Sequence, residues 1–377
     1  MAGIYIHIPF CRQACHYCDF HFSTNLSLKD KMVVALEQEL HLQRQYLENC
    51  SIETIYFGGG TPSLLNESEL AQILVKIYSI FNVVPNVELT LEANPDDLDH
   101  IKLKNLRSLG FNRLSIGIQS FSNETLKFLN RVHTGREALE CVNFARKAGF
   151  ENISIDLIYG IAANGHQGWE RDLQTVGDLL PEHISAYCLT IEPKTTFGAW
   201  MKKGLMNHVD DDYAAQQFEH LLCFLNDKGY EQYEISNFCQ PGKYSLHNTN
   251  YWRQEKYLGI GPGAHSYNGN SRQFNVSHNN NYIKSIEIGV VPCEMDHLTT
   301  SDNINEYIMT SLRTRWGCDL NKIFKDYDVN IFQKNEEYIN NIVLSGYGKY
   351  EANVLFLTTK GKLLADKIAS DLFVNLI

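Results

Sequence analysis

The chain has 377 residues, 44% of them hydrophobic, and a net charge of −11. This length and composition suit one large folded domain with a smaller one, and the acidic charge disfavours a broad nucleic-acid-binding surface. No apolar run approaches ~18 residues and the first residues carry no basic segment, so neither a membrane span nor a signal peptide is expected.

Strand-like and helical segments alternate over the first two-thirds of the chain. Strands are expected at Ile4–Phe10, Thr54–Phe57, Glu88–Glu92, Arg113–Ile118, Ile153–Tyr159, His183–Ile191 and Gln232–Ile235. Ser27 is expected to cap the first helix, and further helices are expected near 67–81, 97–109, 136–148, 167–179 and 211–228. The alternation predicts a parallel α/β sheet, closed or nearly closed into a barrel, although about seven strands fall short of a complete eight-stranded one.

A short cysteine-rich stretch, IYIHIPFCRQACHYCDF, follows the first expected strand. Cys11, Cys15 and Cys18 stand in C-x3-C-x2-C spacing. Three thiolates suit three corners of a cubane iron–sulfur cluster and leave one iron without a protein ligand. Together with His16 or His21, the same thiolates would instead complete a tetrahedral zinc site. The spacing favours a metal or cluster site over three unligated thiols and leaves both metals open.

The remaining seven cysteines are scattered singly. Because the chain holds ten cysteines and no export signal, we expect a reducing cytoplasmic setting rather than a disulfide scaffold. The scattered residues are expected to be small buried side chains: Cys50, Cys141, Cys188, Cys223, Cys239, Cys293 and Cys318.

The string CxxxCxYC resembles the signature of the radical S-adenosylmethionine (SAM) superfamily. The preceding YIHIPFC is similar to the group that contains oxygen-independent coproporphyrinogen III oxidase and the HemW-type haem chaperones. The resemblance implies a [4Fe–4S] cluster on the three cysteines, with SAM chelating the open iron through its amine and carboxylate. An electron from the cluster then cleaves SAM to methionine and a 5′-deoxyadenosyl radical. The implied fold is α/β, an open partial (β/α)6-type TIM barrel whose cluster loop follows the first strand.

Polar residues near the ends of later strands match SAM-pocket positions of that group. FGGGTPS holds three consecutive glycines, which let a backbone approach a ligand closely, although such turns are common. Asp156 interrupts the apolar ISIDLIYG and is therefore either satisfied structurally or facing the barrel mouth, and we favour the mouth. Arg131 suits the SAM carboxylate through a charge-assisted fork. The residues that the resemblance assigns to SAM are Tyr5, Tyr17, Gly59, Gly60, Thr61, Glu92, Gln119, Arg131, Asp156 and Thr190.

A stretch dense in Gly, Asn and Pro is expected to wrap the barrel as an extended connection over 236–297. It contains HNTNYW. A histidine beside aromatic residues is more often simply hydrogen-bonded than a ligand. The string HNxxYW, however, resembles the mark of the HemW-type branch, where it is associated with haem binding. This implies His247 as an axial haem ligand with Tyr251 and Trp252 stacked on the macrocycle, and His265 is a second candidate ligand.

The last part of the chain changes to helices and short strands. We expect a radical SAM barrel over 1–235, the connecting segment over 236–297 and a helical, winged-helix-like domain over 298–377. Some domains of that shape bind DNA. Residues 300–377, however, contain nine Lys and Arg against ten Asp and Glu, so a packing or lid role is favoured over nucleic-acid binding.

Two functions compete within the group: a haem chaperone and the oxidase that converts coproporphyrinogen III to protoporphyrinogen IX. HNTNYW favours the chaperone. Phe20 stands where the oxidases carry an extra cysteine, and the chain starts only a few residues before its first strand, without the oxidase's long N-terminal arm. A radical SAM enzyme acting on RNA is disfavoured by the acidic charge.

The favoured interpretation implies a haem chaperone with a [4Fe–4S] cluster, SAM and haem as cofactors. Its partners are haem-accepting proteins, membrane-associated or not, and no nucleic acid. The sequence leaves open whether SAM is cleaved productively, whether a hydrogen-abstraction substrate exists and whether haem is bound covalently. It also leaves open whether cluster and SAM binding drive formation of a homodimer.

Overall fold

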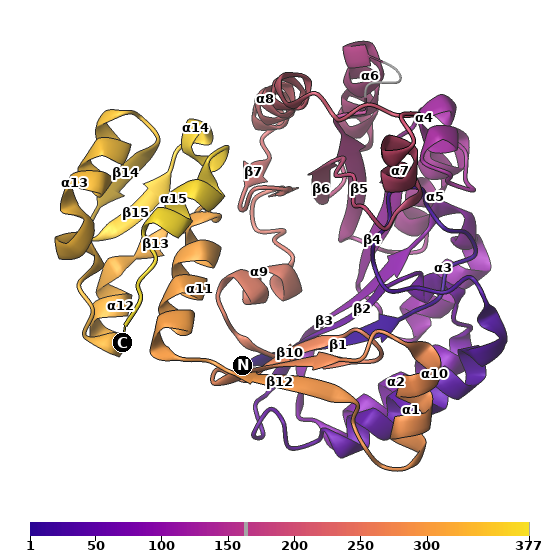
Figure 1. The fold of residues 1–377 in the computed structure, drawn as a ribbon. Helices are drawn as coiled ribbons and strands as arrows, with labels where there is room; N and C mark the ends of the chain where they lie inside the picture. The colour runs from indigo at the N-terminus through magenta and orange to yellow at the C-terminus, as the bar shows by residue number, and fades with distance from the viewer. Residues whose placement is uncertain (162–164, 377) are drawn as a thin grey trace.

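The computed structural model describes residues 1–161 and 165–376. Within those ranges its main element is a twelve-stranded sheet with the order β12-β11-β10-β9-β1-β2-β3-β4-β5-β6-β8-β7 (Figure 1). The strands are β1 (Ala2–Ile8), β2 (Ile52–Gly59), β3 (Val83–Ala93), β4 (Arg113–Gln119), β5 (Ile153–Tyr159), β6 (His183–Cys188), β7 (Glu231–Gln232), β8 (Asn237–Cys239), β9 (Lys256–Ile260), β10 (His265–Tyr267), β11 (Ser271–Asn275) and β12 (Cys293–His297).

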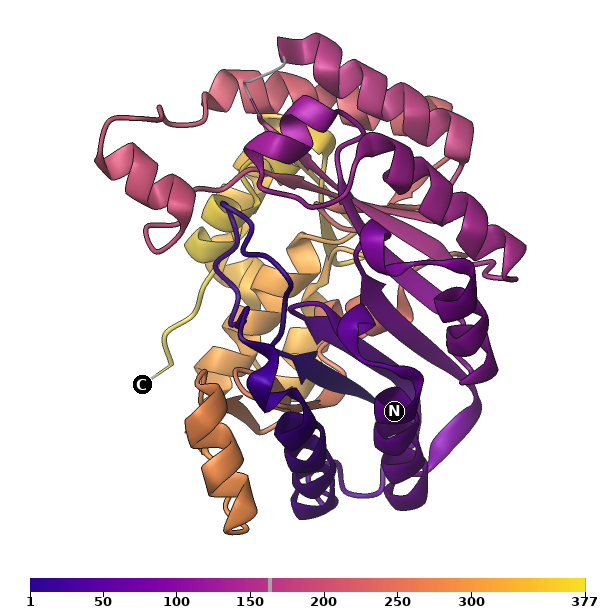
Figure 2. The ribbon, with the colours of Figure 1, turned by 90° about the vertical axis from the view of Figure 1, so that its right-hand side faces the viewer.

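Strands β1 to β6 are parallel neighbours and curve into an open partial barrel, which confirms the expected fold class. Helices cover the convex face of the sheet, while its concave face looks toward the C-terminal part of the chain (Figures 1 and 2). The helices of this region are α1 (Lys29–Leu42), α2 (Glu67–Ile80), α3 (His100–Ser108), α4 (Asn123–Phe128), α5 (Gly135–Lys147), α6 (Gly165–Leu179), α7 (Thr196–Lys202) and α8 (Asp211–Asp227).

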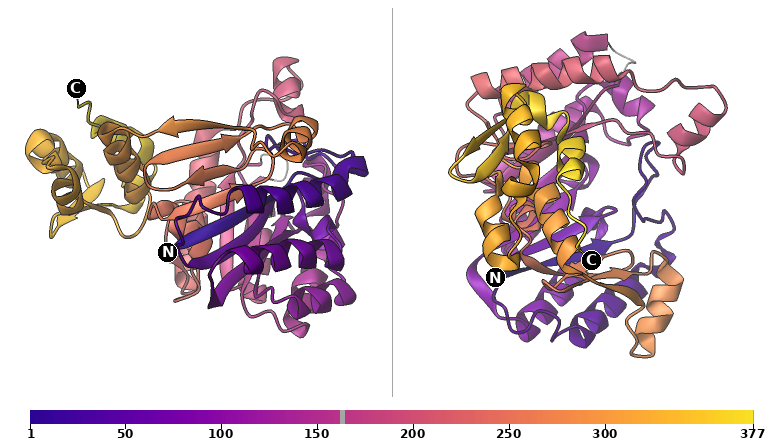
Figure 3. Two further views of the ribbon diagram at one scale, coloured as in Figure 1. Left: turned by 90° about the horizontal axis from the view of Figure 1, so that it is seen from below. Right: turned by 60° about the vertical axis from the view of Figure 1, so that its left-hand side comes forward.

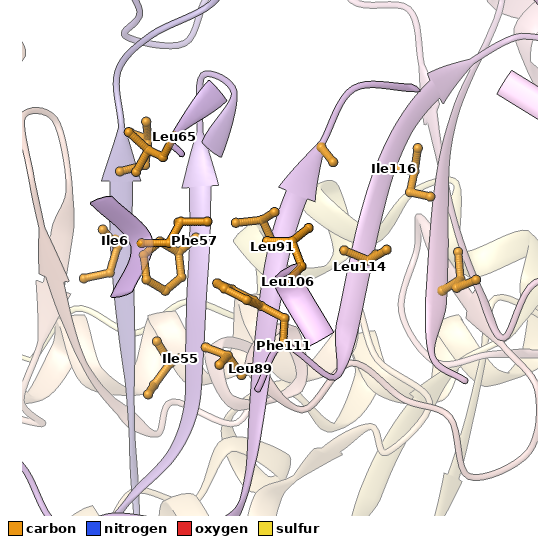
Figure 4. Close-up of a cluster of buried hydrophobic side chains, with 14 of the residues drawn as sticks. Ile6, Ile55, Phe57, Leu65, Leu89, Leu91, Leu106, Phe111, Leu114 and Ile116 are labelled. Carbon is orange, nitrogen blue, oxygen red and sulfur yellow. The ribbon is translucent and has the colours of Figure 1, made fainter. Parts of the chain in front are cut away.

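Alternation along each parallel strand separates an apolar outer face from a polar inner face. On β3, Leu89 and Leu91 point toward the helices and are almost fully buried, whereas Glu92 points to the concave side. Figure 4 shows the outer layer, in which Phe57 and Phe111 pack edge to face with ring centroids 5.5 Å apart. The period of two is therefore kept in this parallel sheet because the helices that connect successive parallel strands cover only its outer face.

Two sequence expectations about element ends are wrong. Ser27 does not cap the first helix: Asn25 accepts the Ser27 N–H and starts a short 3₁₀ helix over Leu26–Leu28, after which α1 begins at Lys29. The seventh strand is Glu231–Gln232 and runs antiparallel to β8, because the backbone N–H of Tyr233 bonds back to Asn237 across a tight turn. It therefore does not extend the parallel barrel.

Residues 236–297 were expected to be an extended connection, and the structure differs. They contain α9 (Leu246–Trp252), α10 (Asn279–Glu287) and the five strands β8 to β12, of which β9 pairs parallel with β1. Ile260, Tyr282 and Ile286 belong to the same hydrophobic cluster as β1 to β6. Gly261, Gly263 and Gly269 lie in the connections between β9, β10 and β11, while other glycines and asparagines of the segment lie within its helices and strands, so the segment extends the barrel's own sheet.

The C-terminal part forms a second hydrophobic cluster, built from Ile304 onward. Its elements are α11 (Thr300–Leu312), β13 (Cys318–Asp319), α12 (Leu320–Tyr327), α13 (Ile331–Leu344), β14 (Gly348–Glu351), β15 (Val354–Leu357), α14 (Thr359–Lys362) and α15 (Ala365–Asp371). Figure 3 shows this unit beside the antiparallel strands, and Arg272 of β11 donates to both carboxylate oxygens of Glu306 at 2.8 and 2.7 Å. The winged-helix-like character of this unit stays a prediction.

None of the helices described for this chain is both long enough and apolar enough to cross a membrane.

Candidate functional site

The three clustered cysteines lie on a loop whose two ends are joined by backbone hydrogen bonds. Cys11 N donates to Ser23 O at 3.1 Å, and Ser23 N donates to Pro9 O at 2.9 Å. Pro9 has no N–H with which to continue β1, so the chain leaves the sheet there. The loop thus starts and ends at one point, the carboxyl end of β1.

The outer side of this loop is fastened to the segment that follows α4. His16 N donates to Leu129 O at 3.1 Å, and the Asn130 side-chain amide donates to Ala14 O at 2.7 Å. Asn130 holds a left-handed backbone, with φ of 61°, which an asparagine tolerates. The cysteine loop is therefore held from both sides before any ligand binds.

Hydrogen-bond donors face two of the cysteine sulfurs. Thr61 Oγ1 lies 3.4 Å from Cys11 Sγ, and Arg131 Nη1 lies 3.4 Å from Cys15 Sγ. Burial raises the pKa of Cys11 to about 11 and that of Cys18 to about 12. These two thiols are accordingly protonated at neutral pH, and a metal bound by them would have to displace the protons.

The two histidines that would complete a zinc site are held by other groups. A ring nitrogen of His16, Nδ1, lies 3.0 Å from Phe128 O, and His21 Nε2 lies 2.7 Å from Asn279 Oδ1. Across 1–161 and 165–376, no three His, Cys, Asp or Glu side chains are gathered closely enough to hold a single metal ion. Cys11, Cys15 and Cys18 all line one cavity, and three separate thiols suit a multi-iron cluster, in which each binds a different iron.

The glycine motif after β2 brings backbone against the cysteine loop. Gly59 has φ of +105°, a conformation that side chains rarely adopt. A Cβ at Gly60 would lie 2.6 Å from Phe10 O and 2.9 Å from Ile8 O. Only glycine fits at these positions, so the motif is shaped by this contact.

Two carboxylates stand beside the glycine motif on the inner face of the sheet. Glu92 accepts from Tyr56 OH at 2.7 Å and from Gly59 N at 3.2 Å, and Asp156 accepts from Ser115 OH at 3.3 Å. Burial raises the pKa of Glu92 to about 7 against the opposing effect of its hydrogen bonds, and burial likewise raises the pKa of Asp156 to about 6. Both groups therefore titrate close to neutral pH.

Arg131 links the cysteine loop to the ends of two strands. Its Nη2 donates to Asn94 Oδ1 and to Gly117 O, both at 2.6 Å, while Nη1 faces Cys15. A Cβ at Gly117 would lie 2.9 Å from Gln119 Nε2 and 3.3 Å from Arg131 Nη2, so glycine leaves room for both side chains. Since Nη2 is in use, Arg131 would present Nε, which has no hydrogen-bond partner among the described residues, and Nη1, which faces Cys15, to a ligand.

These residues line one cavity of about 480 Å³ at the carboxyl ends of the strands, which we call the cysteine cavity. Its volume falls within the range of small-molecule sites. The sequence-predicted residues that line it are Cys11, Cys15, Cys18, Tyr17, Gly59, Gly60, Thr61, Glu92, Gln119, Arg131, Asp156 and Thr190. Tyr5 is not among the lining residues, and its ring stacks on that of Tyr56 with the centroids 6.0 Å apart.

Sequence reasoning missed several residues that the structure places at this cavity. Asn94, Ser115 and Gly117 follow or alternate with predicted residues on β3 and β4, so the period of two could have found them. Phe20 and Tyr187 lie at the mouth, with 70% and 45% of their surfaces exposed. The other missed lining residues are Gln13, Asp19, Ala93, Ile158, Cys188, Leu189 and Glu192.

The three residues expected to bind haem lie apart from the cysteine cavity, on α9. His247 is 2% exposed, and its Nδ1 lies 2.7 Å from Thr54 Oγ1 while its Nε2 lies 3.0 Å from Tyr251 OH. Trp252 is half-buried beneath the Arg313 guanidinium, 5.8 Å from the ring centroid. The second candidate, His265, is exposed on β10 and packs edge-on against Phe274.

Comparison with known proteins identifies relatives of the whole chain. Residues 5–175 match the Radical SAM superfamily. The chain is 35% identical over 371 residues to "Heme chaperone HemW" of Bacillus subtilis, covering 98% of each protein. It is also 38% identical over 265 residues to "Heme chaperone HemW" of Escherichia coli, covering 70% of this chain and 69% of that protein.

A solved structure shares the fold. The structure titled "Coproporphyrinogen III oxidase (HemN) from Escherichia coli is a Radical SAM enzyme" superposes with a TM-score of 0.87 at 24% identity, covering 100% of this chain and 90% of that one. The likeness extends over the barrel and the C-terminal unit. At this level of identity it establishes the fold alone.

Proposed function

The chain belongs to the radical SAM superfamily and, within it, to the HemW family of haem chaperones; on this premise we propose that it binds haem and delivers it to acceptor proteins. We further propose that Cys11, Cys15 and Cys18 hold a [4Fe–4S] cluster and that SAM occupies the rest of the cysteine cavity.

The observation that carries the cofactor proposal is the convergence of the three cysteines with the glycine motif and two carboxylates on one cavity of about 480 Å³. A cluster with SAM supplies one-electron chemistry when bound. The thiols at the carboxyl end of β1 would be the cluster ligands. Thr61 and Arg131 direct donors at their sulfurs, which suits thiolate ligands.

The remaining cavity residues suit a ligand with an amine, hydroxyls and a carboxylate. Glu92 and Asp156 are acceptors when ionised, and together they favour a cationic or hydroxylated ligand. Arg131 offers the charge for a carboxylate close to Cys15. Tyr17 packs against the hydrophobic cluster that contains Ile158 and Leu189, and all three line the cavity, to which Tyr17 contributes an aromatic surface.

The haem proposal is supported by the names of the relatives and by the HNTNYW string. His247 as iron ligand stays a prediction, and the geometry adds a condition to it. Both ring nitrogens are engaged by hydroxyls, so ligation requires the bond to Thr54 or the bond to Tyr251 to break. His265 already exposes its ring and would need no such change.

The alternative function, oxidation of coproporphyrinogen III, is tested together with the chaperone function. Anaerobically reconstituted protein is incubated with reductant, SAM and coproporphyrinogen III, and products are read by mass spectrometry. Haem is then titrated into the protein, and the haem-loaded protein is mixed with apomyoglobin as acceptor. Stoichiometric haem binding with transfer and no decarboxylation is expected. Loss of two carboxyl groups from the substrate would overturn the chaperone proposal in favour of the oxidase.

We also propose that the chain forms a homodimer when the cluster or SAM binds, a point that the sequence left open, and the molar mass in solution tests it. Light scattering is recorded for the cluster-free protein, the reconstituted protein and the reconstituted protein with SAM. A doubling of mass on reconstitution or on SAM addition is expected, and an unchanged mass in all three samples would refute it.

A further inference from the structure

Helix α9 lies on the concave side of the sheet, against β1 and β2 (Figure 1). Its first turn is fixed to β3: Leu246 N and His247 N donate to the two carboxylate oxygens of Glu88 at 3.0 and 2.9 Å. A carboxylate at a helix N-terminus satisfies N–H groups that the helix itself leaves unpaired. The position of His247 relative to the sheet is therefore fixed by backbone as well as by side-chain contacts.

The imidazole of His247 is wedged between the sheet and Tyr251. Its two nitrogens are held by the hydroxyls of Thr54 and Tyr251. Burial lowers the pKa of His247 to about 3, so the ring is neutral, with one donor and one acceptor nitrogen. Two hydroxyls, which can each donate or accept, match either tautomer. The ring is thus fully satisfied in this position.

One face of this ring supports Tyr56. The two rings are stacked with centroids 4.9 Å apart and an interplanar angle of 21°. Tyr56 is 8% exposed, and a Cβ at Gly58 would lie 2.9 Å from its ring, so the tyrosine fills a closely bounded slot. Removing the imidazole would open space on the one side of that slot which α9 supplies.

Tyr56 in turn orients a carboxylate of the cysteine cavity. Its hydroxyl donates to Glu92 Oε1 at 2.7 Å, and Glu92 Oε2 accepts from Gly59 N at 3.2 Å. A continuous series of contacts therefore runs from His247 through Tyr56 to Glu92. It joins the HNTNYW string to the cavity although none of that string lines the cavity.

We propose that His247 is a positioning residue for the SAM site: by stacking on Tyr56 it holds the Glu92 carboxylate in place for a ligand in the cysteine cavity. This inference rests on the proposed function, because Glu92 matters to it only if SAM binds there. The proposed role of His247 depends on the stacking of its ring on Tyr56 and does not require iron ligation.

The test is the dissociation constant of SAM for the reconstituted protein, measured anaerobically by calorimetry, with the SAM-induced change in the EPR spectrum of the cluster as a second readout. His247→Ala is expected to weaken SAM binding about tenfold, because Glu92 loses the alignment of a hydrogen bond to a charged group. His247→Phe keeps a ring against Tyr56 but has no nitrogen for iron, and SAM binding is expected to weaken less than about threefold.

A matched control is His183→Ala. His183 is equally buried, and its two nitrogens are held by Ser154 and Tyr233 hydroxyls, both at 2.7 Å, but neither partner contacts Glu92. It is expected to lose stability as His247→Ala does while its SAM affinity stays within about twofold of wild type. If both variants lose the same SAM affinity, the loss of any buried histidine weakens SAM binding and the inference is overturned.

A double-mutant cycle separates action through Tyr56 from independent effects. In a Tyr56→Phe background, His247→Ala is expected to weaken SAM binding by less than about twofold further, because the hydroxyl it positions is already absent. If the loss of SAM affinity in the double variant equals the product of the losses in the two single variants, His247 does not act through Tyr56 and the inference is refuted. If His247→Ala does not fold, Tyr251→Phe, which removes one partner of the imidazole, should weaken SAM binding about two- to threefold, and an unchanged affinity would refute the inference.

The outcomes distinguish this inference from the function on which it rests. If wild-type protein with a full cluster binds no SAM, the proposed function fails. If wild type binds SAM and His247→Ala binds it equally well, the proposed function stands and the positioning role of His247 is refuted.

Discussion

The two faces of the parallel strands are built from alternating residues and serve different ends. On the outer face, Phe57, Leu91 and Leu114 are fully buried beneath the helices. On the inner face, Tyr56 and Glu92 occupy the alternate positions and form part of the cysteine cavity or its support. Parallel strands are commonly apolar on both faces. Here stability and chemistry are divided between neighbouring residues of the same strand, so single substitutions should separate them.

The largest effect is expected on the inner side, at the cysteine loop. Replacing Cys11, Cys15 or Cys18 by alanine should abolish assembly of the proposed cluster, in which each thiol would bind a different iron. Iron and sulfide content and the visible absorbance after anaerobic reconstitution measure this. Cys223→Ala is the matched control, since Cys223 on α8 is exposed and not buried as the sequence suggested, and this variant should retain the full iron content. Retention of the full iron content by any of the three variants would contradict the assignment.

The outer face should carry stability without affecting the site. Leu91→Ala removes a fully buried side chain next to Glu92 and is expected to lower the free energy of unfolding by about 2–5 kcal/mol. Chemical denaturation measures the loss, while the SAM affinity of the folded protein should change less than about twofold. Val75→Ala, at a 68% exposed position on α2, should cost less than about 0.5 kcal/mol. A large loss of SAM affinity in Leu91→Ala would break the division between the faces.

A buried carboxylate in the helix layer should make the stability of the fold depend on pH. Glu39 accepts from Tyr282 OH at 2.5 Å and from Gly261 N and Asn275 Nδ2 at 2.7 Å, and burial raises its pKa from 4.5 to about 7. Between these values the folded chain binds a proton that the unfolded chain has lost, so the free energy of unfolding falls as pH rises, by up to about 3 kcal/mol.

Stability curves of wild type and Glu39→Gln between pH 4.5 and 8 measure this contribution. The decline with rising pH should be smaller in Glu39→Gln, since the amide does not titrate, and Glu37→Gln on the same helix should leave it as in wild type. A wild-type decline that is the same in Glu39→Gln would assign the pH dependence to other groups.

The smallest effect is expected from the carboxylate of the inner face. Glu92→Gln should weaken SAM binding about tenfold at pH 8, where the carboxylate is ionised. In wild type, SAM affinity should fall as pH is lowered through about 7 and then about 6, because Glu92 and Asp156 become protonated and lose their attraction for a cationic ligand.

In Glu92→Gln the decrease in SAM affinity around pH 7 should be absent. Calorimetric titration of SAM across pH 5.5–8.5 measures it. Glu182→Gln is the control, since Glu182 is buried but paired with Arg146 away from the cavity. An unaltered pH profile in Glu92→Gln would show that Glu92 does not face the ligand.

The sequence by itself predicted the parallel barrel, the cysteine loop and half of the residues that line the cysteine cavity. Their signals are local: a period of two along each strand, a spacing of three cysteines and polar residues at strand ends. Since the carboxyl ends of parallel strands meet at one edge, local signals of this kind converge in space without further information.

Only the tertiary structure decided what surrounds that cavity. In the structure, residues 236–297 extend the sheet, Tyr5 does not line the cavity, and the expected seventh strand runs antiparallel to β8. It also buried His247 against Thr54, a residue 193 positions away in the chain. Contacts of this kind depend on which elements become neighbours after folding, and no local periodicity records that choice, so the sequence could name His247 but could not show what its ring supports.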